Sequence, residues 1–211
     1  MAKQKILPVV NISKLYVAKL QTETMTEISF DTPRYLEGVK QLGIKLKQNS
    51  DAYYHEGRKV LEEKTLQDIS VTIDITSLTD EDEAYVMGHT LAKTGGIIKN
   101  DNDIAPDLAL IYEYEKAQGV IGYGILYAGN FGLADETIKD KEGKSNFQSK
   151  QIQASFRPLI NGLWQYKVSS DSPNVNPEIL KSFFDKVFIP EKLETEEKVG
   201  EKVPEAAQTT V

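Results

Sequence analysis

The chain has 211 residues, of which 40% are hydrophobic and 27% charged, and this composition is typical of a folded protein with one large domain or two small ones. Its formal net charge of −7 argues against tight, non-specific binding to nucleic acid, because such binding needs clustered Lys and Arg. The absence of cysteine excludes disulfides and thiolate sites, and no run approaches the roughly 18 apolar residues of a membrane-spanning helix, so we expect no membrane partner.

The first third of the chain predicts short strands behind an irregular start. Residues 1–13 contain Pro8 and little periodicity, which predicts an extended N-terminal arm. Strands are predicted over residues 14–20 and 26–30. Residues 39–47 alternate between apolar and polar side chains, which indicates a strand with one buried face.

Residues 48–64 form a polar excursion with aromatic residues at its centre, either a loop or a hairpin. An excursion of this length is uncommon in compact domains and tends to be functional. Tyr and Arg are enriched at interface hot spots, so a contact between subunits fits this composition at least as well as a site for nucleic acid or sugar. The candidate contact residues are Tyr53, Tyr54, His55, Arg58 and Lys59.

The clearest strand and the clearest helix follow each other. In residues 66–76, Val71, Ile73 and Ile75 alternate with polar side chains, as in a half-buried strand. A short helix is predicted over residues 79–87, because Thr79 and Asp82 form a capping-box pattern and acidic residues fill the first turn. Gly88 fits a left-handed C-terminal cap.

The next segment predicts a hairpin of two strong strands. A strand with a bend is expected over residues 90–99, and a turn over residues 100–103. Residues 108–115 and 120–128 read as antiparallel strands joined by residues 116–119. Gly122 and Gly124 leave one face of the second strand bare, so that a backbone or an aromatic side chain can approach it closely.

The remainder predicts a loop, a second strand pair, a helix and a tail. The loop covers residues 130–149, and strands over residues 147–159 and 163–168 are expected to pair around a turn at 158–162. Apolar spacing after Pro177 predicts a helix over residues 177–187. The fold class is therefore mainly β: one domain over residues 14–189 with one or two short flanking helices, followed by a disordered acidic tail over 190–211.

No candidate for catalysis or metal binding stands out. The two histidines lie in unrelated segments: His55 is expected to form a surface pair with Glu56, and His89 to meet carbonyls at the end of the helix. The acidic residues 80–83 lack the spacing of a calcium loop and suit a helix cap, and turn chemistry explains residues 100–103. We therefore expect no cofactor, no metal and no enzymatic activity.

The order of these features resembles the major tail protein of long-tailed bacteriophages, of the phi13-like family found in phages of Gram-positive bacteria. The resemblance covers about residues 35–188. The segments that carry it are YHEGR at 54–58, LQDISVTI at 66–73, the helix at 79–87, DLALIYEY at 107–114, YAGNF at 127–131, SFRP at 155–158 and LWQY at 163–166.

This resemblance implies a structural virion protein. The domain would be a β-sandwich or barrel-like fold flanked by a helix. Six copies would close into a ring, and stacked rings would form the tail tube through which DNA leaves the head without specific binding. The implied partners are other copies of the chain, the tape measure protein and other tail proteins. The implied location is the phage tail, after assembly in the host cytoplasm.

Two other readings stay open. One is a β-sandwich module that binds a glycan or a protein, with Tyr53, Tyr54 and Trp164 as the aromatic contacts. The other is a tail-terminator or connector protein, which forms a single ring that does not extend.

Overall fold

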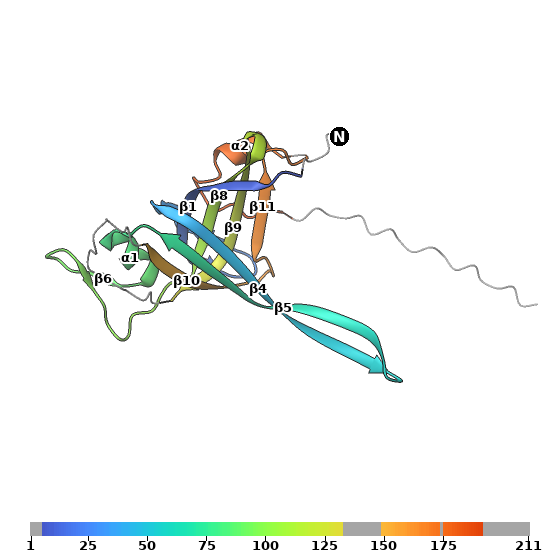
Figure 1. Cartoon of the computed structure of the whole chain (residues 1–211). Helices are drawn as coiled ribbons and strands as arrows, with labels where there is room; N and C mark the ends of the chain where they lie inside the picture. The colour runs from blue at the N-terminus through green and yellow to red at the C-terminus, as the bar shows by residue number, and fades with distance from the viewer. Residues whose placement is uncertain (1–5, 133–148, 174, 192–211) are drawn as a thin grey trace, which may run out of the picture.

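The computed structural model describes residues 6–132, 149–173 and 175–191. Over these residues the protein is mainly β, as predicted, with one large antiparallel sheet, a two-stranded sheet and two short α-helices (Figure 1). The large sheet contains β1 (Val9–Glu23), β2 (Ile28–Phe30), β3 (Arg34–Tyr35), β4 (Val39–His55), β5 (Arg58–Ile75), β8 (Leu108–Lys116), β9 (Val120–Phe131), β10 (Lys150–Arg157) and β11 (Gln165–Ser169). The other elements are α1 (Asp80–Met87), β6 (Thr90–Leu91), β7 (Ile97–Ile98), a 3₁₀ turn at Ala117–Gly119 and α2 (Pro177–Lys181).

The large sheet folds over on itself. Its strand order is β2-β1-β8-β9-β10-β5-β4, with β3 attached to β1 and β11 attached to β9. The β4–β5 pair crosses in front of the other strands in Figure 1. Ile69, Val71, Ile73 and Ile75 of β5 alternate with less buried residues, as the sequence predicted, and point toward the opposite strands.

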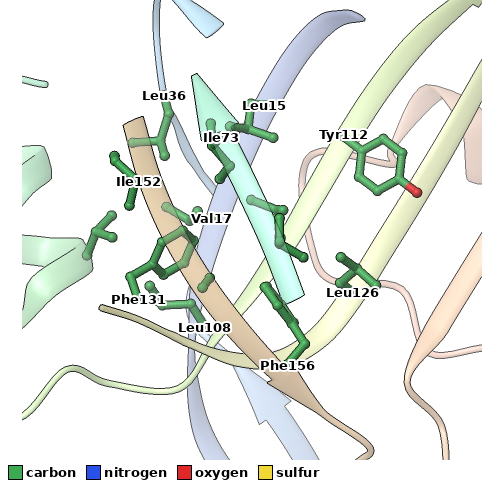
Figure 2. Close-up of a cluster of buried hydrophobic side chains, with 14 of the residues drawn as sticks. Leu15, Val17, Leu36, Ile73, Leu108, Tyr112, Leu126, Phe131, Ile152 and Phe156 are labelled. Carbon is green, nitrogen blue, oxygen red and sulfur yellow. The ribbon is translucent and has the colours of Figure 1, made fainter. Parts of the chain in front are cut away.

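An inner core fills the space between the two halves of the sheet. Its side chains come from β1, β5, β8, β9 and β10 and from the segments beside them (Figure 2). Burial of side chains of this size stabilises the fold by about 1.5–3 kcal/mol each. The inner core includes Leu15, Val17, Leu36, Ile73, Leu108, Leu126, Phe131, Ile152 and Phe156.

An outer core lies on the other face of β8 and β9, where the chain after β11 returns. Phe183 is 1% exposed there and packs in the same cluster as Tyr123, Ile125 and Tyr127. The Tyr127 hydroxyl donates a hydrogen bond to the carbonyl of Phe188 at 2.8 Å. Because both faces are covered, β9 is buried without alternation along most of its length.

The helix α1 begins and ends as the sequence predicted. The Thr79 side chain accepts a hydrogen bond from the backbone N–H of Asp82, and Gly88 adopts a left-handed conformation with φ of 75°. The acidic first turn pairs with cations from other elements: Arg34 contacts Asp82 at 2.6 Å, and Lys150 and Lys99 both contact Glu83. These contacts fix α1 to β3 and β10.

The glycines of β9 admit aromatic rings, which confirms the prediction of a close approach. A side chain on Gly124 would overlap the ring of Tyr112, and one on Gly122 would overlap the ring of Tyr114. Gly129, in the same strand, is covered in the same way by Phe156 of β10. These contacts let large rings lie flat across β9 inside the inner core.

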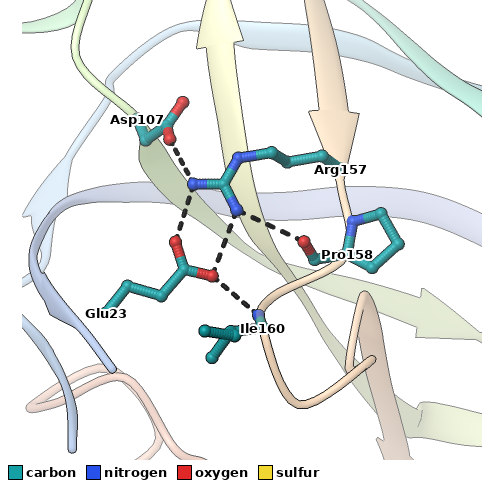
Figure 3. A network of polar contacts seen from close by, with 5 residues as sticks. All are labelled: Glu23, Asp107, Arg157, Pro158 and Ile160. Carbon is teal, nitrogen blue, oxygen red and sulfur yellow. Dashed lines mark hydrogen bonds and ion pairs between the residues drawn. The ribbon is translucent and has the colours of Figure 1, made fainter. Parts of the chain in front are cut away.

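A polar network ties the end of β10 to the first half of the chain (Figure 3). Arg157 contacts Glu23 at 2.7 Å and Asp107 at 2.6 Å. Glu23 also accepts a hydrogen bond from the backbone N–H of Ile160 at 2.8 Å. The network therefore joins β1, the start of β8 and the turn after β10.

The structure corrects the predicted strands over residues 14–20 and 90–99. The first strand begins at Val9 and not at residue 14, because residues from Val9 onward pair with the far end of β8. The predicted strand over residues 90–99 is wrong. It is a small hairpin of β6 and β7, because Gly95 and Gly96 take φ values of 90° and 88° that turn the chain.

Two further predictions are corrected. The pairing of the strands around residues 158–162 is wrong, because β10 and β11 both pair with the same edge of β9. The helix predicted over 177–187 ends at Lys181, and the apolar residues that follow it pack against the outer core from a series of turns. Most of the predicted loop over 130–149 and nearly all of the predicted tail over 190–211 lie outside the described residues.

Candidate subunit-contact site on a protruding hairpin

The β4–β5 hairpin extends beyond the body of the molecule (Figure 1). The two strands pair continuously from Val39 opposite Ile75 to His55 opposite Arg58, so the predicted excursion over 48–64 is the far half of a hairpin. Every side chain from Lys45 to Thr65 is exposed. The near half of the hairpin belongs to the inner core, and the far half contacts no other part of the described chain closely enough to be buried.

A two-residue turn closes the hairpin. Glu56 has φ of 49° and Gly57 has φ of 76°, and positive φ at both positions is typical of a type I′ turn. The register shifts between Tyr53 and Tyr54, which marks a β-bulge close to the turn. The bulge and the turn set the local backbone geometry at the tip.

All five candidate contact residues lie together at this tip. Tyr53 is 62% exposed and Tyr54 60% exposed, and Tyr54 lies opposite Lys59 on the return strand. Sequence reasoning missed Val60 and Leu61, which are 63% and 53% exposed. They were missed because they fall in a segment that reads as polar, and only the pairing of Leu61 with Tyr53 shows that two apolar side chains lie side by side there.

In the far half of the hairpin one carboxylate is paired with a cation, and two others are not. Glu62 contacts Lys59 at 2.6 Å and accepts a hydrogen bond from Ser50, and these contacts hold the pKa of Glu62 below its usual range, the Lys59 contact having the larger effect. Asp51 and Glu63 lie directly opposite each other, and neither has an ion pair with any described residue. Like charges at opposing positions destabilise a β-ribbon.

The length of the far half determines what its side chains can contact. His55 lies nine positions after Leu46, and at about 3.3 Å per residue the tip lies about 30 Å beyond the last residue near the body. A two-stranded ribbon with no core of its own is only marginally stable in water. Exposed apolar side chains at such a distance are typical of a surface that contacts another molecule.

Trp164 lies elsewhere. Its side chain packs against the inner core, and its carbonyl accepts a hydrogen bond from the N–H of Tyr127 at 3.3 Å. The structure therefore does not bring Trp164 together with Tyr53 and Tyr54 into one aromatic platform.

His89 has a different partner from the one predicted. Its Nδ1 lies 2.7 Å from the Asp103 carboxylate, and its side chain is 2% exposed, so it meets a carboxylate and not the carbonyls of α1. The N–H of Asn100 also donates to Asp103 at 2.9 Å, and these two contacts lower the pKa of Asp103, with the Asn100 contact the larger cause. His89 thus holds the turn at residues 100–103 against α1.

The described residues hold no group of three or more His, Cys, Asp or Glu side chains placed to bind a metal ion. Within the described ranges, no helix is long and apolar enough to cross a membrane.

The chain matches no model of a known protein family, and a search of curated proteins also finds no match.

Proposed function

We propose that this protein is a structural component of a bacteriophage tail, in which copies of the chain form rings that stack into a tube for the passage of DNA. The observation that carries the proposal is the β4–β5 hairpin, whose tip exposes Tyr53, Tyr54, Val60 and Leu61 about 30 Å from the body. Such a tip is suited to contact a subunit in the next ring. The order of sequence features resembles that of major tail proteins. This resemblance is the reason for placing the contact in a phage tail.

The edge of the sheet supports a second contact. β4 is the last strand of the large sheet, and its outer edge pairs with no other described strand. An unpaired edge is a hazard for a monomer, but it is a means of joining copies in an assembly. Contacts that repeat head to tail close into a ring when the rotation allows it, and a different contact then stacks the rings.

The net charge supports the transport role. A chain with a net charge of −7 can present a surface that repels phosphate, so DNA slides along the tube without being held. The tape measure protein and other tail proteins are the remaining expected partners. No cofactor is needed for this role.

The test is the assembly state of the purified full chain. Sedimentation and negative-stain electron microscopy at increasing concentration are expected to show rings and then extending tubes. Single rings that never extend would favour a tail-terminator or connector protein. A monomer at all concentrations, even when tail partners are added, would contradict the proposal, and binding on a glycan array by such a monomer would favour a glycan-binding module.

A further inference from the structure

An apolar groove opens into the inner core beside the part of β4 that precedes the far half of the hairpin. Its volume is about 320 Å³, and it lies between β1, β4, β8 and β11. β5 pairs with β10, whereas β11 pairs only with β9. The β4–β5 pair therefore covers the inner core on the side of β10 and leaves it open on the side of β11, and this opening is the groove. Its lining includes Val9, Ile12, Leu42, Ile44, Tyr114 and Lys167.

The groove contains both an apolar wall and a free charge. Val9 is 62% exposed at its rim, and Ile44 and Ile12 pack against the inner core from its sides. Lys167 is exposed at the same rim and has no ion pair among the described residues. The groove is therefore suited to an apolar ligand group that carries a carboxylate beside it.

One face of the hairpin tip carries apolar side chains with carboxylates beside them. Tyr53 lies opposite Leu61, and two residues further along each strand Asp51 lies opposite Glu63. Side chains two residues apart share a face of a strand, so the apolar pair and the acidic pair lie next to each other on one face. A cation supplied from outside the hairpin would remove the repulsion between the two carboxylates.

The tip of one molecule cannot fill the groove of the same molecule. Ile44 of the groove and Tyr53 of the tip lie on one continuous strand, nine residues and about 30 Å apart. The two surfaces can meet only between copies of the chain. Because the surfaces differ, each copy that docks leaves its own groove or its own tip free for the next copy.

We propose that the hairpin tip of one copy docks in the groove of a second copy. Tyr53 and Leu61 pack against Val9, Ile12 and Ile44 of the second copy, and Lys167 of that copy pairs with Asp51 and Glu63. This inference rests on the proposed function, and it specifies the surface that receives the hairpin. The contact is head to tail, in contrast to a symmetric contact between two tips.

Cysteine cross-linking tests this contact directly, because the natural chain contains no cysteine. The double variant Leu61→Cys/Val9→Cys of the full chain is expected to give a ladder of covalent oligomers on mild oxidation, since each copy then carries a cysteine on both surfaces of the contact. Each single variant is expected to give no ladder. The matched control is Leu61→Cys/Lys181→Cys, which places the second cysteine at an exposed position in α2.

Charge reversal provides an independent measurement. Lys167→Glu alone, and Asp51→Lys/Glu63→Lys alone, are each expected to weaken self-association on the order of tenfold in sedimentation experiments. The triple variant is expected to regain most of the affinity, because the opposite charges are restored with their positions exchanged. Thermal unfolding of each variant establishes that the body has folded.

The outcomes separate this inference from the proposed function. Assembly of the natural chain together with a missing ladder, or with no recovery in the triple variant, overturns the groove contact and leaves the tube intact. Covalent dimers from Leu61→Cys alone as the main product also overturn it, since they show tips meeting tips. Failure of the natural chain to associate overturns both.

Discussion

Arg157 and Glu23, which lie 134 residues apart, are joined by two parallel hydrogen bonds. The two guanidinium nitrogens of Arg157 lie 3.1 and 2.7 Å from the two carboxylate oxygens of Glu23. This fork geometry is stronger and more specific than a single contact between point charges. It connects the last residue of β10 with the last residue of β1, two strands that are not neighbours in the sheet.

The Glu23→Gln variant is expected to lower the free energy of unfolding near neutral pH by about 1 kcal/mol. The hydrogen bonds from Arg157 hold the pKa of Glu23 below its usual value of 4.5, so the ionised form is favoured in the folded protein. The contribution of Glu23 is therefore present above pH 4.5 and is lost as the pH falls through the lowered pKa. Urea unfolding of the natural chain and the variant between pH 7 and pH 3 measures this difference.

Glu27→Gln is the matched control, because Glu27 is exposed and lies in the turn beyond the same strand. It is expected to change the unfolding free energy little at any pH. If the difference in unfolding free energy between Glu23→Gln and the natural chain stays constant down to pH 3, the ionised Glu23 carboxylate is not the source of the stabilisation.

The Gly124→Ala variant is expected to destabilise the body by about 1–3 kcal/mol, because its new methyl group would overlap the buried ring of Tyr112. Gly43→Ala is the control, since a Cβ there meets its nearest neighbour, the Thr72 carbonyl oxygen, at an ordinary 3.7 Å. Thermal unfolding compares the two. Equal effects of both substitutions would show that the ring moves aside freely.

Shortening the hairpin is expected to prevent stacking without unfolding the body. Replacing residues 48–67 with Asn-Gly joins Lys47 directly to its partner Asp68 through a two-residue turn and keeps the register of the near half. Circular dichroism and thermal unfolding measure the fold, and electron microscopy measures the tubes. Tubes of normal length from the shortened chain would exclude the hairpin from assembly.

The Tyr127→Phe variant is expected to have a free energy of unfolding about 1 kcal/mol lower, because it lacks the hydrogen bond to the Phe188 carbonyl at 2.8 Å. The loss is expected to increase amide hydrogen exchange in the segment after α2, which depends on this contact for its position over β9. Tyr166→Phe is the control, because the Tyr166 ring also packs against Phe188 but its hydroxyl has no hydrogen bond with a described residue. Equal exchange in both variants would contradict the role of Tyr127.

The parts of the fold that the sequence predicted are those set by local chemistry. The alternation ending at Ile75, the Thr79 cap and the bare face at Gly122 each depend on neighbouring residues alone. The near half of the hairpin was predicted for the same reason. Its far half was read as either a loop or a hairpin, because the backbone ladder between the strands needs no apolar side chains to continue past Lys47.

The parts that were missed depend on distant contacts. The pairing of β11 could not be read from the five-residue turn before it, because β10 covers only Ala128–Phe131 of β9 and leaves the rest of that edge open for β11. The helix after Pro177 ended early because packing of Phe183 and Phe184 on the outer core satisfies their apolar surface without a helix. The partner of His89 lies fourteen residues away across a turn.

The pairing of β1 with β8 also sets an order of events during synthesis. The β4–β5 hairpin is local and can form as soon as residue 75 is available, whereas β1 has to wait for a strand about a hundred residues later in the chain. The groove needs residues from Val9 to Lys167 in their final places. A nascent chain therefore completes the residues of the tip long before those of the groove, and under the proposed contact polymerisation would wait until the subunit is complete.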